Sequence, residues 1–477
     1  MSFFGIDFGT TNSGAVKLAE HAEAQHYGDE FGEPLPSIVA IDRATGVAIG
    51  GRKVWEARER YIDSGQYHIV QSVKWKLGKD QVWVTEQRTW SPREVTSFIL
   101  TQLSDRAAAL GIDRIDRAAI TIPVDFPASS RTELRLAAEA ADIELSTFVT
   151  ESTAAFMRYL PQLRHCHYVA VFDWGGGTLD ISILEIRGGT IFELSTEGME
   201  IAGDEIDLDL ARAIHARVME QRHCAIPFES MPAADRDNLR TKCERAKCQL
   251  TSLDSTDVLL TSYGEGTLHF VLERAWFESL ITAHVDLAIE TLTKAIENCR
   301  LSFDALDRLL IIGGSSKIRL LQSKLRADRR FSAALYVSEQ AEWDVAHGAA
   351  IVELSPGGYE TAESIGIMLS DNTFYEIISH GERAFKRQRE LALSLVEDSR
   401  QANIIVEKRA KRDSAGSERI LAFSVDTLGF DLEELRLNYN ITHDLILKLR
   451  ASSAAMGSRD GAGGEYGKLR FAYHIDD

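Results

Sequence analysis

The amino-acid sequence predicts an α/β protein with a large N-terminal domain of mixed strands and helices and a small C-terminal β-sandwich. Residues 3–16 and 169–183 each run from an apolar strand through a glycine-containing turn into a second strand. A third apolar strand, residues 309–312, opens onto glycines and a helix-like segment. From Ser364 onward, short strands of alternating apolar and polar residues recur at even spacing, as in a β-sandwich.

Composition places the chain among ordinary globular proteins. Its 477 residues correspond to two or three domains, and 44% hydrophobic and 26% charged residues are typical of such folds. The formal net charge of −19 disfavours nucleic-acid binding, which relies on lysine and arginine to neutralise phosphates. No apolar run approaches transmembrane length, and no signal-peptide pattern precedes Asp7. Five cysteines without the spacing of a disulfide framework indicate a reducing compartment. Taken together, these features lead us to expect a cytoplasmic monomer that binds neither membrane nor nucleic acid.

The two strand–turn–strand segments share a chemistry as well as a pattern. Each apolar strand ends in an aspartate, Asp7 or Asp173, and glycines follow at once. A glycine turn exposes backbone N–H groups without side chains in the way, so it can wrap a polyphosphate. Carboxylates such as Asp173 and Asp180 fit beside phosphates only if a metal ion or a water stands between them. A single motif of this kind would be better explained as a flexible turn with solvated aspartates, but two suggest a duplicated framework with one phosphate loop from each half.

The third strand adds a possible sugar or phosphate site. Residues 309–312 lead into Gly313, Gly314, Ser315 and Ser316, and a helix-like segment starts at Lys317. A helix N-terminus after a buried strand is a favourable position for an anionic group. Neither a P-loop motif nor a dinucleotide-binding glycine fingerprint is present in the sequence. The Cys243/Cys248 pair and the His165-Cys166-His167 run lack the spacing of a metal site.

The chain resembles the seventy-kilodalton heat-shock (DnaK-type) chaperones of the actin-like ATPase superfamily. Six motifs carry the resemblance, in order, over the first three quarters of the chain: GIDFGTTNS at 5–13, AITIP at 119–123, TESTAA at 150–155, FDWGGGTLD at 172–180, CERAK at 243–247 and IGGSS at 312–316. The resemblance implies an actin-like ATPase (duplicated ribonuclease H-like) domain at 1–355, a linker at 356–363, and a β-sandwich peptide-binding domain without the family's helical lid at 364–477.

The resemblance also implies slow hydrolysis of Mg-ATP by water. Asp7 and Asp173 would hold the water shell of Mg²⁺, and Lys74 would offset charge on the γ-phosphate. Asp173, Asp180 or Glu151 would orient or deprotonate the attacking water, and the sequence does not decide among them. The phosphates would be bound by Gly9, Thr10, Thr11, Asn12, Gly175, Gly176, Gly177 and Thr178, and the nucleoside part by Gly203, Glu244, Lys247, Gly313, Gly314, Ser315, Lys317 and Glu342.

The chain departs from the family pattern at several named positions. Cys248 and Lys317 stand where members have arginines near the adenine, which predicts weaker nucleotide affinity. In the family, the linker between the two domains is an aliphatic strand, whereas this chain has Pro356-Gly357-Gly358 at that place. Three further positions differ. This chain has Ala202 where the family has the first of two glycines, Ser152 where it has a proline, and Thr147 where it has an arginine that engages J-domain partners.

The C-terminal part is expected to contain strands at 364–369, 391–396, 404–406, 420–425, 435–441 and 445–449. Residues 454–465 are rich in glycine and serine, and we expect them to be mobile. The basic cluster at 408–412 is expected in a solvated turn between strands.

Three functions are compatible with these features. The first is an ATP-gated chaperone that binds unfolded or extended polypeptide segments, with a co-chaperone or exchange factor as possible partner. The second is a nucleotide-dependent regulatory or scaffold protein whose β-domain docks one folded partner; the altered linker and Thr147 favour it. The third, a small-molecule kinase of the same superfamily, is disfavoured by the terminal β-domain.

Overall fold

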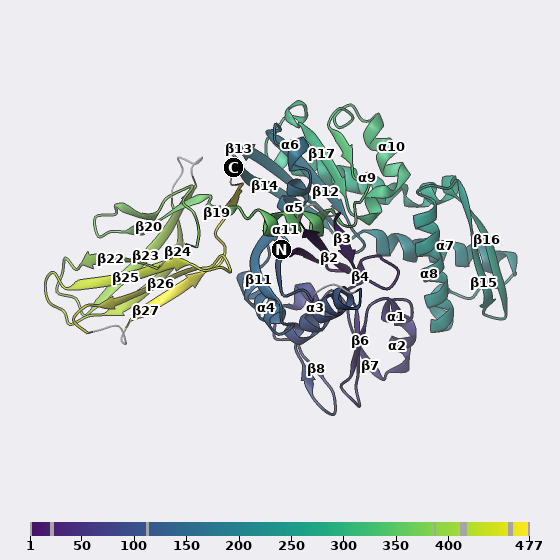
Figure 1. Ribbon diagram of the computed structural model, residues 1–477, viewed down its shortest axis with the longest axis horizontal. Helices are drawn as coiled ribbons and strands as arrows, with labels where there is room; N and C mark the ends of the chain where they lie inside the picture. The colour runs from purple at the N-terminus through teal and green to yellow at the C-terminus, as the bar shows by residue number, and fades with distance from the viewer. Residues whose placement is uncertain are drawn as a thin grey trace. The chain divides into compact units, whose positions relative to one another are not determined.

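The computed structural model describes residues 2–19, 23–110, 114–385, 388–410, 417–456 and 461–475 (Figure 1). The chain forms two compact units. The first contains residues 1–125, 133–185 and 193–354, and the second contains residues 126–132, 186–192 and 355–477.

Two sheets of the same topology form the framework of the first unit. In each, an antiparallel hairpin (β1–β2 or β12–β13) pairs on its other side with a parallel strand (β10 or β17), which pairs in turn with a further parallel strand. This repeat agrees with the duplicated framework predicted from the sequence. The strands are β1 (Ser2–Phe8), β2 (Asn12–Ala19), β3 (Gln25–Tyr27), β4 (Leu35–Pro36), β10 (Arg117–Ile122) and β11 (Glu144–Thr150) in one sheet, and β12 (Tyr168–Trp174), β13 (Leu179–Arg187), β14 (Thr190–Met199), β17 (Arg308–Ile312) and β18 (Leu335–Val337) in the other.

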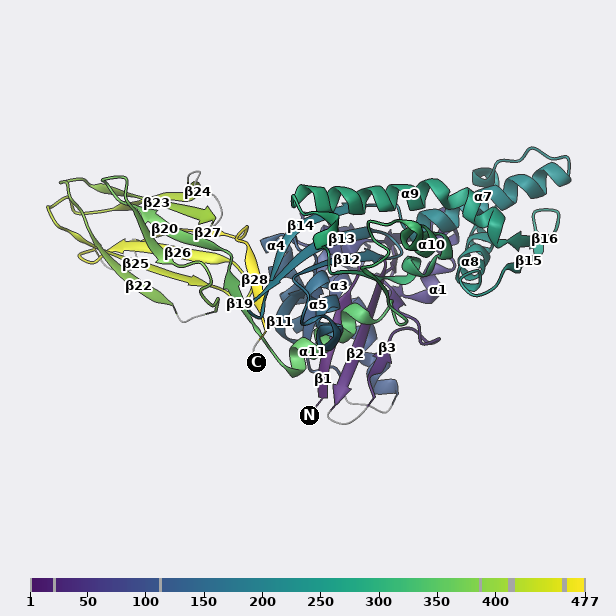
Figure 2. The ribbon, with the colours of Figure 1, turned by 90° about the horizontal axis from the view of Figure 1, so that it is seen from above.

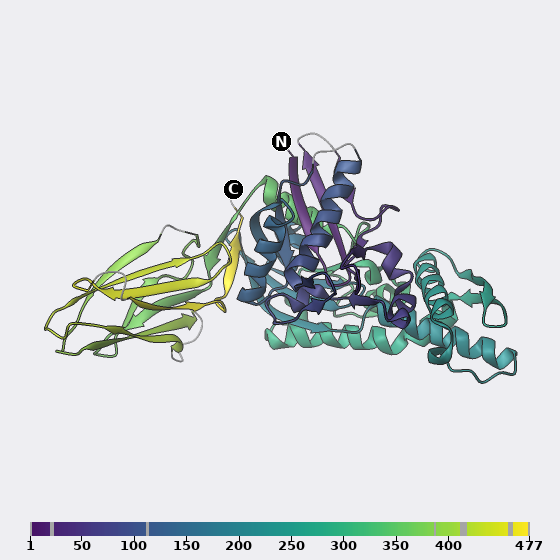
Figure 3. The same ribbon diagram turned by 90° about the horizontal axis from the view of Figure 1, so that it is seen from below.

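Smaller strands and most of the helices surround these sheets. The long helix α9 runs along the sheet that contains β12 and β13 (Figures 2 and 3). The helices are α1 (Arg52–Trp55), α2 (Arg58–Ser64), η1 (Val73–Lys76), α3 (Pro92–Ala109), α4 (Ala128–Glu139), α5 (Glu151–Arg158), α6 (Leu160–Leu163), α7 (Gly203–Gln221), η2 (Phe228–Ser230), α8 (Ala233–Gln249), α9 (Arg274–Asn298), η3 (Phe303–Ala305), η4 (Gly314–Lys317), α10 (Arg319–Ala327) and α11 (Asp344–Leu354). The smaller strands are β5 (Val39–Asp42), β6 (Ala48–Gly50), β7 (Tyr67–Val70), β8 (Trp83–Val84), β9 (Thr89–Trp90), β15 (Ser255–Tyr263) and β16 (Gly266–Glu273).

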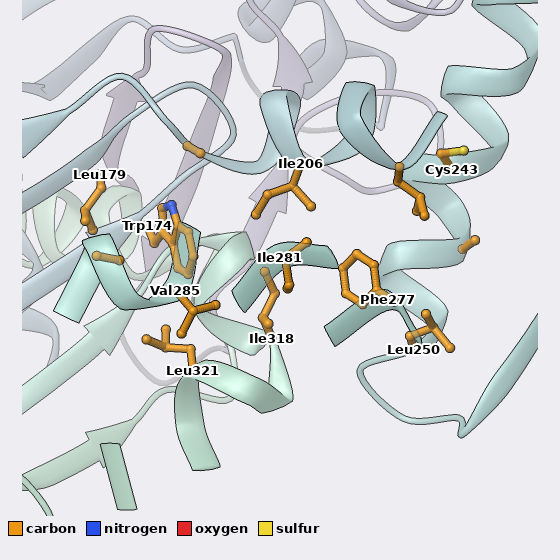
Figure 4. Packing of buried hydrophobic residues seen from close by; sticks show 14 of the residues in the cluster. Trp174, Leu179, Ile206, Cys243, Leu250, Phe277, Ile281, Val285, Ile318 and Leu321 are labelled. Atoms are coloured by element: carbon orange, nitrogen blue, oxygen red, sulfur yellow. The ribbon is translucent and has the colours of Figure 1, made fainter. Parts of the chain in front are cut away.

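A hydrophobic core joins the second sheet to its helices (Figure 4). Trp174 from β12 packs with Ile206 from α7, Ile281 and Val285 from α9, and Leu321 from α10, and all five are essentially inaccessible to solvent. Burying these side chains removes their apolar surface from water, which is the main favourable term in folding. Because Trp174 immediately precedes the glycine turn, this core fixes the position of that turn.

Glycines allow α11 to lie directly against its neighbours. A Cβ atom on Gly5 of β1 would come within 2.1 Å of the Ala350 backbone nitrogen of α11, and one on Gly348 would come within 1.7 Å of the Ala154 carbonyl oxygen of α5. Only glycine can occupy such positions without displacing the backbone opposite. This close packing holds α5, whose first residue is Glu151, beside β1 and its Asp7.

The second unit contains two four-stranded antiparallel sheets, ordered β21-β20-β23-β24 and β22-β25-β26-β27. Burial alternates along β25, as expected for a strand with one covered face. The strands are β19 (Gly358–Thr361), β20 (Glu363–Met368), β21 (Phe374–Ile378), β22 (Arg389–Ser394), β23 (Gln401–Ala410), β24 (Glu418–Asp426), β25 (Glu434–Ile441), β26 (Leu447–Ser453), β27 (Ala462–Tyr466) and β28 (Phe471–His474).

Two expectations for this unit are corrected by the structure. At the end of the segment expected to be mobile, β27 pairs with β26, and its glycines permit the approach: a Cβ atom on Gly463 would lie 2.2 Å from the Leu449 carbonyl oxygen. Residues 457–460 of that segment lie outside the described residues. The basic cluster does not begin in a turn, because Lys408 and Arg409 lie in β23. Lys408 forms ion pairs with Glu363 at 3.1 Å and Glu418 at 3.3 Å. The cluster's residues 411 and 412 lie outside the described residues.

Residues 356–363, predicted as a linker, contain β19. This strand pairs with β28, with Tyr359 opposite Tyr473. In the part of the chain that the structure describes, no helix combines the length and apolar character needed to cross a membrane.

Candidate functional site

A cleft of about 740 Å³ in the first unit brings the predicted site together. Two of the predicted residues, Lys74 and Gly203, are not among its lining residues but contact lining residues directly. The predicted residues that line the cleft are Asp7, Gly9, Thr10, Thr11, Asn12, Glu151, Asp173, Gly175, Gly176, Gly177, Thr178, Asp180, Glu244, Lys247, Gly313, Gly314, Ser315, Lys317 and Glu342.

The two glycine turns face each other across this cleft. A Cβ atom on Gly177 would lie 2.3 Å from Thr11 Oγ1, and one on Gly176 would lie 3.0 Å from Thr11 Cγ2. The second turn is closed by a hydrogen bond of 2.9 Å from the Gly175 N–H to the Thr178 carbonyl oxygen. Side chains larger than hydrogen would therefore fill the space in which backbone N–H groups can meet a phosphate.

Carboxylates gather where the strands enter these turns. Asp7 lies at the end of β1 and accepts a hydrogen bond of 2.8 Å from Thr121 Oγ1. Asp173 and Asp180 are cross-strand partners on β12 and β13, and Thr178 Oγ1 donates to Asp180 Oδ2 at 2.8 Å. Thr121, from the adjacent strand β10, is a contact that the sequence analysis missed, because nothing in the local pattern of Thr121 identifies its partner.

Lys74 supplies positive charge to this group of carboxylates. It lies on η1, its side chain is only 2% exposed, and its Nζ forms an ion pair with Glu151 at the start of α5. Ser72, which precedes η1, has a φ of 52°, a left-handed conformation that turns the chain into this short helix. A lysine kept out of water in this way needs a paired carboxylate, and Glu151 provides it.

Burial and mutual repulsion disfavour the ionised forms of these carboxyl groups. Burial and then Glu151 raise the pKa of Asp7 to about 6, and the same two causes raise the pKa of Asp180 to about 6. Burial, followed by Glu151, Asp180 and Asp7, raises the pKa of Asp173 well above its usual range. A bound cation would reverse these effects, so the donor set fits a divalent metal.

The described residues contain no group of three histidine, cysteine, aspartate or glutamate side chains placed to hold a metal ion directly. In proteins, Mg²⁺ commonly keeps several of its water ligands. Asp7 and Asp173 would then contact the ion through water, and the oxygen chemistry of the donor set fits that role. Cys243, Cys248 and the run at 165–167 do not form such a group either, and all five cysteines are free.

The shifted pKa of Asp7 makes a prediction about stability. We expect Asp7→Asn to raise the unfolding midpoint of the ligand-free protein by about 2–4 °C at pH 7.5. The pKa of Asp7 is raised from 3.8 to about 6, so its contribution to stability is present below pH 3.8 and lost as the pH rises through about 6. The advantage of the variant should therefore shrink as the pH falls from 7 to 4. Thermal unfolding from pH 4 to pH 8 tests this, and an advantage that does not change with pH would contradict it.

The end of the cleft that the resemblance assigns to the nucleoside contains a second charged group. Lys247 Nζ donates to Asp207 Oδ2 at 2.7 Å and to the Gly203 carbonyl oxygen at 3.0 Å. Burial is the main cause that raises the pKa of Asp204 to about 7 and of Asp207 to about 6. Lys317 forms an ion pair with Glu342. These lysines are thus already paired with carboxylates, and Lys247 ties α8 to the start of α7.

Helix α8 contacts both α1 and α2, and these contacts join the two walls of the cleft. Asp237 of α8 is buried and accepts hydrogen bonds from the backbone N–H groups of Glu59 at 2.9 Å and Arg60 at 3.0 Å. Trp55 Nε1 donates to Glu244 Oε2 at 2.9 Å. Asp237 therefore caps the N-terminus of a helix on the opposite wall. Sequence reasoning missed it because the partners lie almost 180 residues apart.

This cap should slow the release of the nucleotide that the sequence predicts for the cleft. We expect Asp237→Ala to speed dissociation of bound nucleotide about tenfold, because hydrogen bonds to a charged group that hold the walls together are each worth about 1.5–3 kcal/mol. Stopped-flow release of a fluorescent ADP measures this rate. Asp257→Ala is the matched control, since Asp257 is exposed on β15 and forms an ion pair with His269 across its own hairpin. Equal release rates in the two variants would contradict the prediction.

Comparisons with known proteins show which family the chain is similar to. The model of a family described as "Hsp70 protein" matches residues 3–429. The chain is 30% identical over 377 residues to a "Chaperone protein DnaK" of Thermosipho melanesiensis and 29% identical over 377 residues to that of Thermosipho africanus. These alignments cover 77% of the present chain and 62% and 61% of the two relatives, so the chain spans about three fifths of the length of the curated relatives it matches.

Proposed function

Because the chain belongs to the Hsp70 family, we propose that it is a chaperone-like ATPase. It binds and slowly hydrolyses Mg-ATP in the cleft of the first unit, and the state of the nucleotide controls the binding of polypeptide segments by the second unit. The observation that carries this proposal is the pair of glycine turns that face each other, with Gly177 against Thr11, below a group of buried carboxylates.

Each part of the cleft has a role in this proposal. Backbone N–H groups of residues 10–12 and 175–178 bind the phosphates, and Asp7 and Asp173 hold the water shell of Mg²⁺. The ion, when bound, neutralises charge that develops on the phosphates. Lys74, held by Glu151, adds positive charge at the γ-phosphate.

A carboxylate must also orient the attacking water and accept its proton. Asp173, Asp180 and Glu151 are all candidates for this base. A pKa of about 6 suits Asp180 for proton transfer near neutral pH. Glu151 is engaged by Lys74, which leaves it better placed to orient that lysine than to move freely.

The domain division follows from this proposal: residues 1–355 form the ATPase domain, 356–363 the linker and 364–477 a β-sandwich that binds peptides. Two adjoining loops of the second unit support peptide binding. The backbone N–H of Leu395 donates to the Glu433 carbonyl oxygen at 3.0 Å, which joins the loop after β22 to the loop before β25. These loops carry the exposed apolar side chains Val396, Leu428, Phe430 and Leu432. Exposed apolar groups clustered in this way suit an extended hydrophobic segment.

A peptide-binding measurement tests the proposal. A fluorescent unfolded hydrophobic peptide should bind the ADP-loaded protein and lose at least tenfold in affinity when ATP replaces ADP. Phe430→Ser should weaken binding in the ADP state, whereas Val84→Ser, which alters an exposed residue of the first unit, should not. Equal affinity in ATP and ADP would reject the gated chaperone.

The second candidate is a nucleotide-dependent regulatory or scaffold protein whose β-domain docks a dedicated folded partner. It is favoured by the absence of an aliphatic run in the linker, where β19 pairs with β28 instead. Equal peptide affinity in both nucleotide states, with ATP binding intact, would support this candidate. For both candidates we propose a cytoplasmic monomer that binds neither nucleic acid nor membranes. A co-chaperone or an exchange factor would assist it, and Thr147 would alter the contact with a J-domain partner.

A further inference from the structure

Three hydroxyl groups at the start of α5 converge on one carboxylate oxygen. Ser152 Oγ donates to Glu193 Oε1 at 2.6 Å and Thr153 Oγ1 donates to the same atom at 3.3 Å. Thr150 Oγ1, the N-cap of α5, also donates to Glu193 Oε1. Glu193 lies on β14, 40 residues away in sequence from the nearest of these donors, so its carboxylate ties a strand of one sheet to the start of a helix.

This arrangement stabilises the first turn of α5 in two ways. Hydrogen bonds to an ionised acceptor are roughly twice as strong as those between neutral groups. A negative charge near a helix N-terminus also interacts favourably with the helix dipole and the free N–H groups. Burial raises the pKa of Glu193, and the three hydroxyl bonds oppose that shift. Removal of the carboxylate would leave three hydroxyl groups without this acceptor.

The residue between these donors is Glu151. It is the first residue of α5, and its side chain holds the buried Lys74 at the cleft. Thr150 and Ser152, the residues on either side of it, are therefore both fixed by Glu193. The bond from Ser152 exists only because serine stands where the family pattern has proline, which has no hydroxyl to donate. In this chain, a strand carboxylate and a serine together define where the backbone of Glu151 lies.

We propose that Glu193 is a positioning residue for ATP hydrolysis: through Thr150, Ser152 and Thr153 it holds Glu151, and thereby Lys74, in the geometry needed for turnover. This inference rests on the proposed ATPase function. Glu193 is not among the residues that line the cleft, so its effect on hydrolysis would pass through Glu151.

A double-mutant cycle tests this role. Single-turnover hydrolysis and ATP affinity are measured for the unmodified chain, Glu193→Ala, Glu151→Gln and the double variant. We expect Glu193→Ala to lower the hydrolysis rate about tenfold with ATP affinity changed less than twofold. In the Glu151→Gln background, Glu193→Ala should cause no further loss, because residues that act as a unit are non-additive.

Two further variants keep the test independent of overall folding. Ser152→Ala removes one donor and should give a smaller loss in rate of the same kind, with the thermal unfolding midpoint nearly unchanged. Asp307→Asn is the matched control: Asp307 braces the far end of β12 by accepting hydrogen bonds from the backbone N–H groups of His167 and Tyr168. It should leave the hydrolysis rate within twofold.

The outcomes separate this inference from the function on which it rests. If the unmodified chain neither binds nor hydrolyses ATP, the proposed function fails. If it hydrolyses ATP and the losses of Glu193→Ala and Glu151→Gln multiply in the double variant, Glu193 has only a structural role and the inference is overturned. If Glu193→Ala does not fold, Ser152→Ala in the same cycle decides between these results.

Discussion

Replacement of Asp173 by asparagine is expected to reduce the single-turnover rate of ATP hydrolysis by at least about a hundredfold, the loss typical of removing one electrostatic group from a reaction centre. Asp173 ends β12, lies opposite Asp180 and lines the cleft. A Cβ atom on Gly313 would come within 2.4 Å of its Oδ1, so Asp173 also lies against the third glycine motif. Asparagine has the same shape but cannot supply the negative charge that balances Mg²⁺.

The matched control for this change is Asp257→Asn on the exposed hairpin β15–β16. Asp257→Asn should leave turnover unchanged, and both variants should unfold at least as high in temperature as the unmodified chain. Asp173→Asn with turnover within twofold of the unmodified chain would show that the carboxylates serve some purpose other than holding Mg-ATP.

The second large effect is expected from Lys74→Met, which should lower turnover about a hundredfold and move the acid limb of its pH profile to higher pH. Lys74 offsets the repulsion from Glu151 and lowers the pKa of Asp7 and of Asp180. Without it, both carboxyl groups would stay protonated to a higher pH, because the hydrogen bonds from Thr121 and Thr178 would be left to oppose burial and repulsion without the lysine's charge. Single-turnover rates between pH 5 and pH 9 measure the shift.

Lys76→Met provides the control, because Lys76 lies on the same short helix η1 and donates to the Gln71 carbonyl oxygen instead of a cleft carboxylate. Its profile should coincide with that of the unmodified chain. A loss of rate in Lys74→Met without any movement of the acid limb would mean that the lysine acts on the phosphate alone and not on the carboxylates.

Much of the candidate site could be predicted from local sequence patterns. The strands, the glycine turns and the aspartates at strand ends all depend on residues next to each other in sequence, so periodicity and turn chemistry reveal them. The capping box of α3 was likewise predictable: Ser91 Oγ accepts from the Glu94 N–H, and the Glu94 carboxylate accepts from the Ser91 N–H. The resemblance then joined the separate motifs into one cleft.

What the sequence did not reveal depends on pairing between distant segments. Asp237 and Glu193 look like ordinary acidic residues until the fold places a helix N-terminus beside each of them. Gly463 reads as part of a mobile tail, although the lack of a side chain is what lets β27 approach β26. Sequence patterns reflect the local conformational preference of the chain, whereas contacts between distant segments determine the roles of Asp237, Glu193 and Gly463.

The most direct test of the central claim is a crystal structure of the chain with Mg²⁺ and a slowly hydrolysed ATP analogue at saturating concentration. Density for the triphosphate is expected between residues 9–12 and 175–178, with Mg²⁺ joined to Asp7 and Asp173 through water. A cleft free of nucleotide under these conditions, with its carboxylates unchanged, would contradict the claim that the two glycine turns bind one Mg-nucleotide between them.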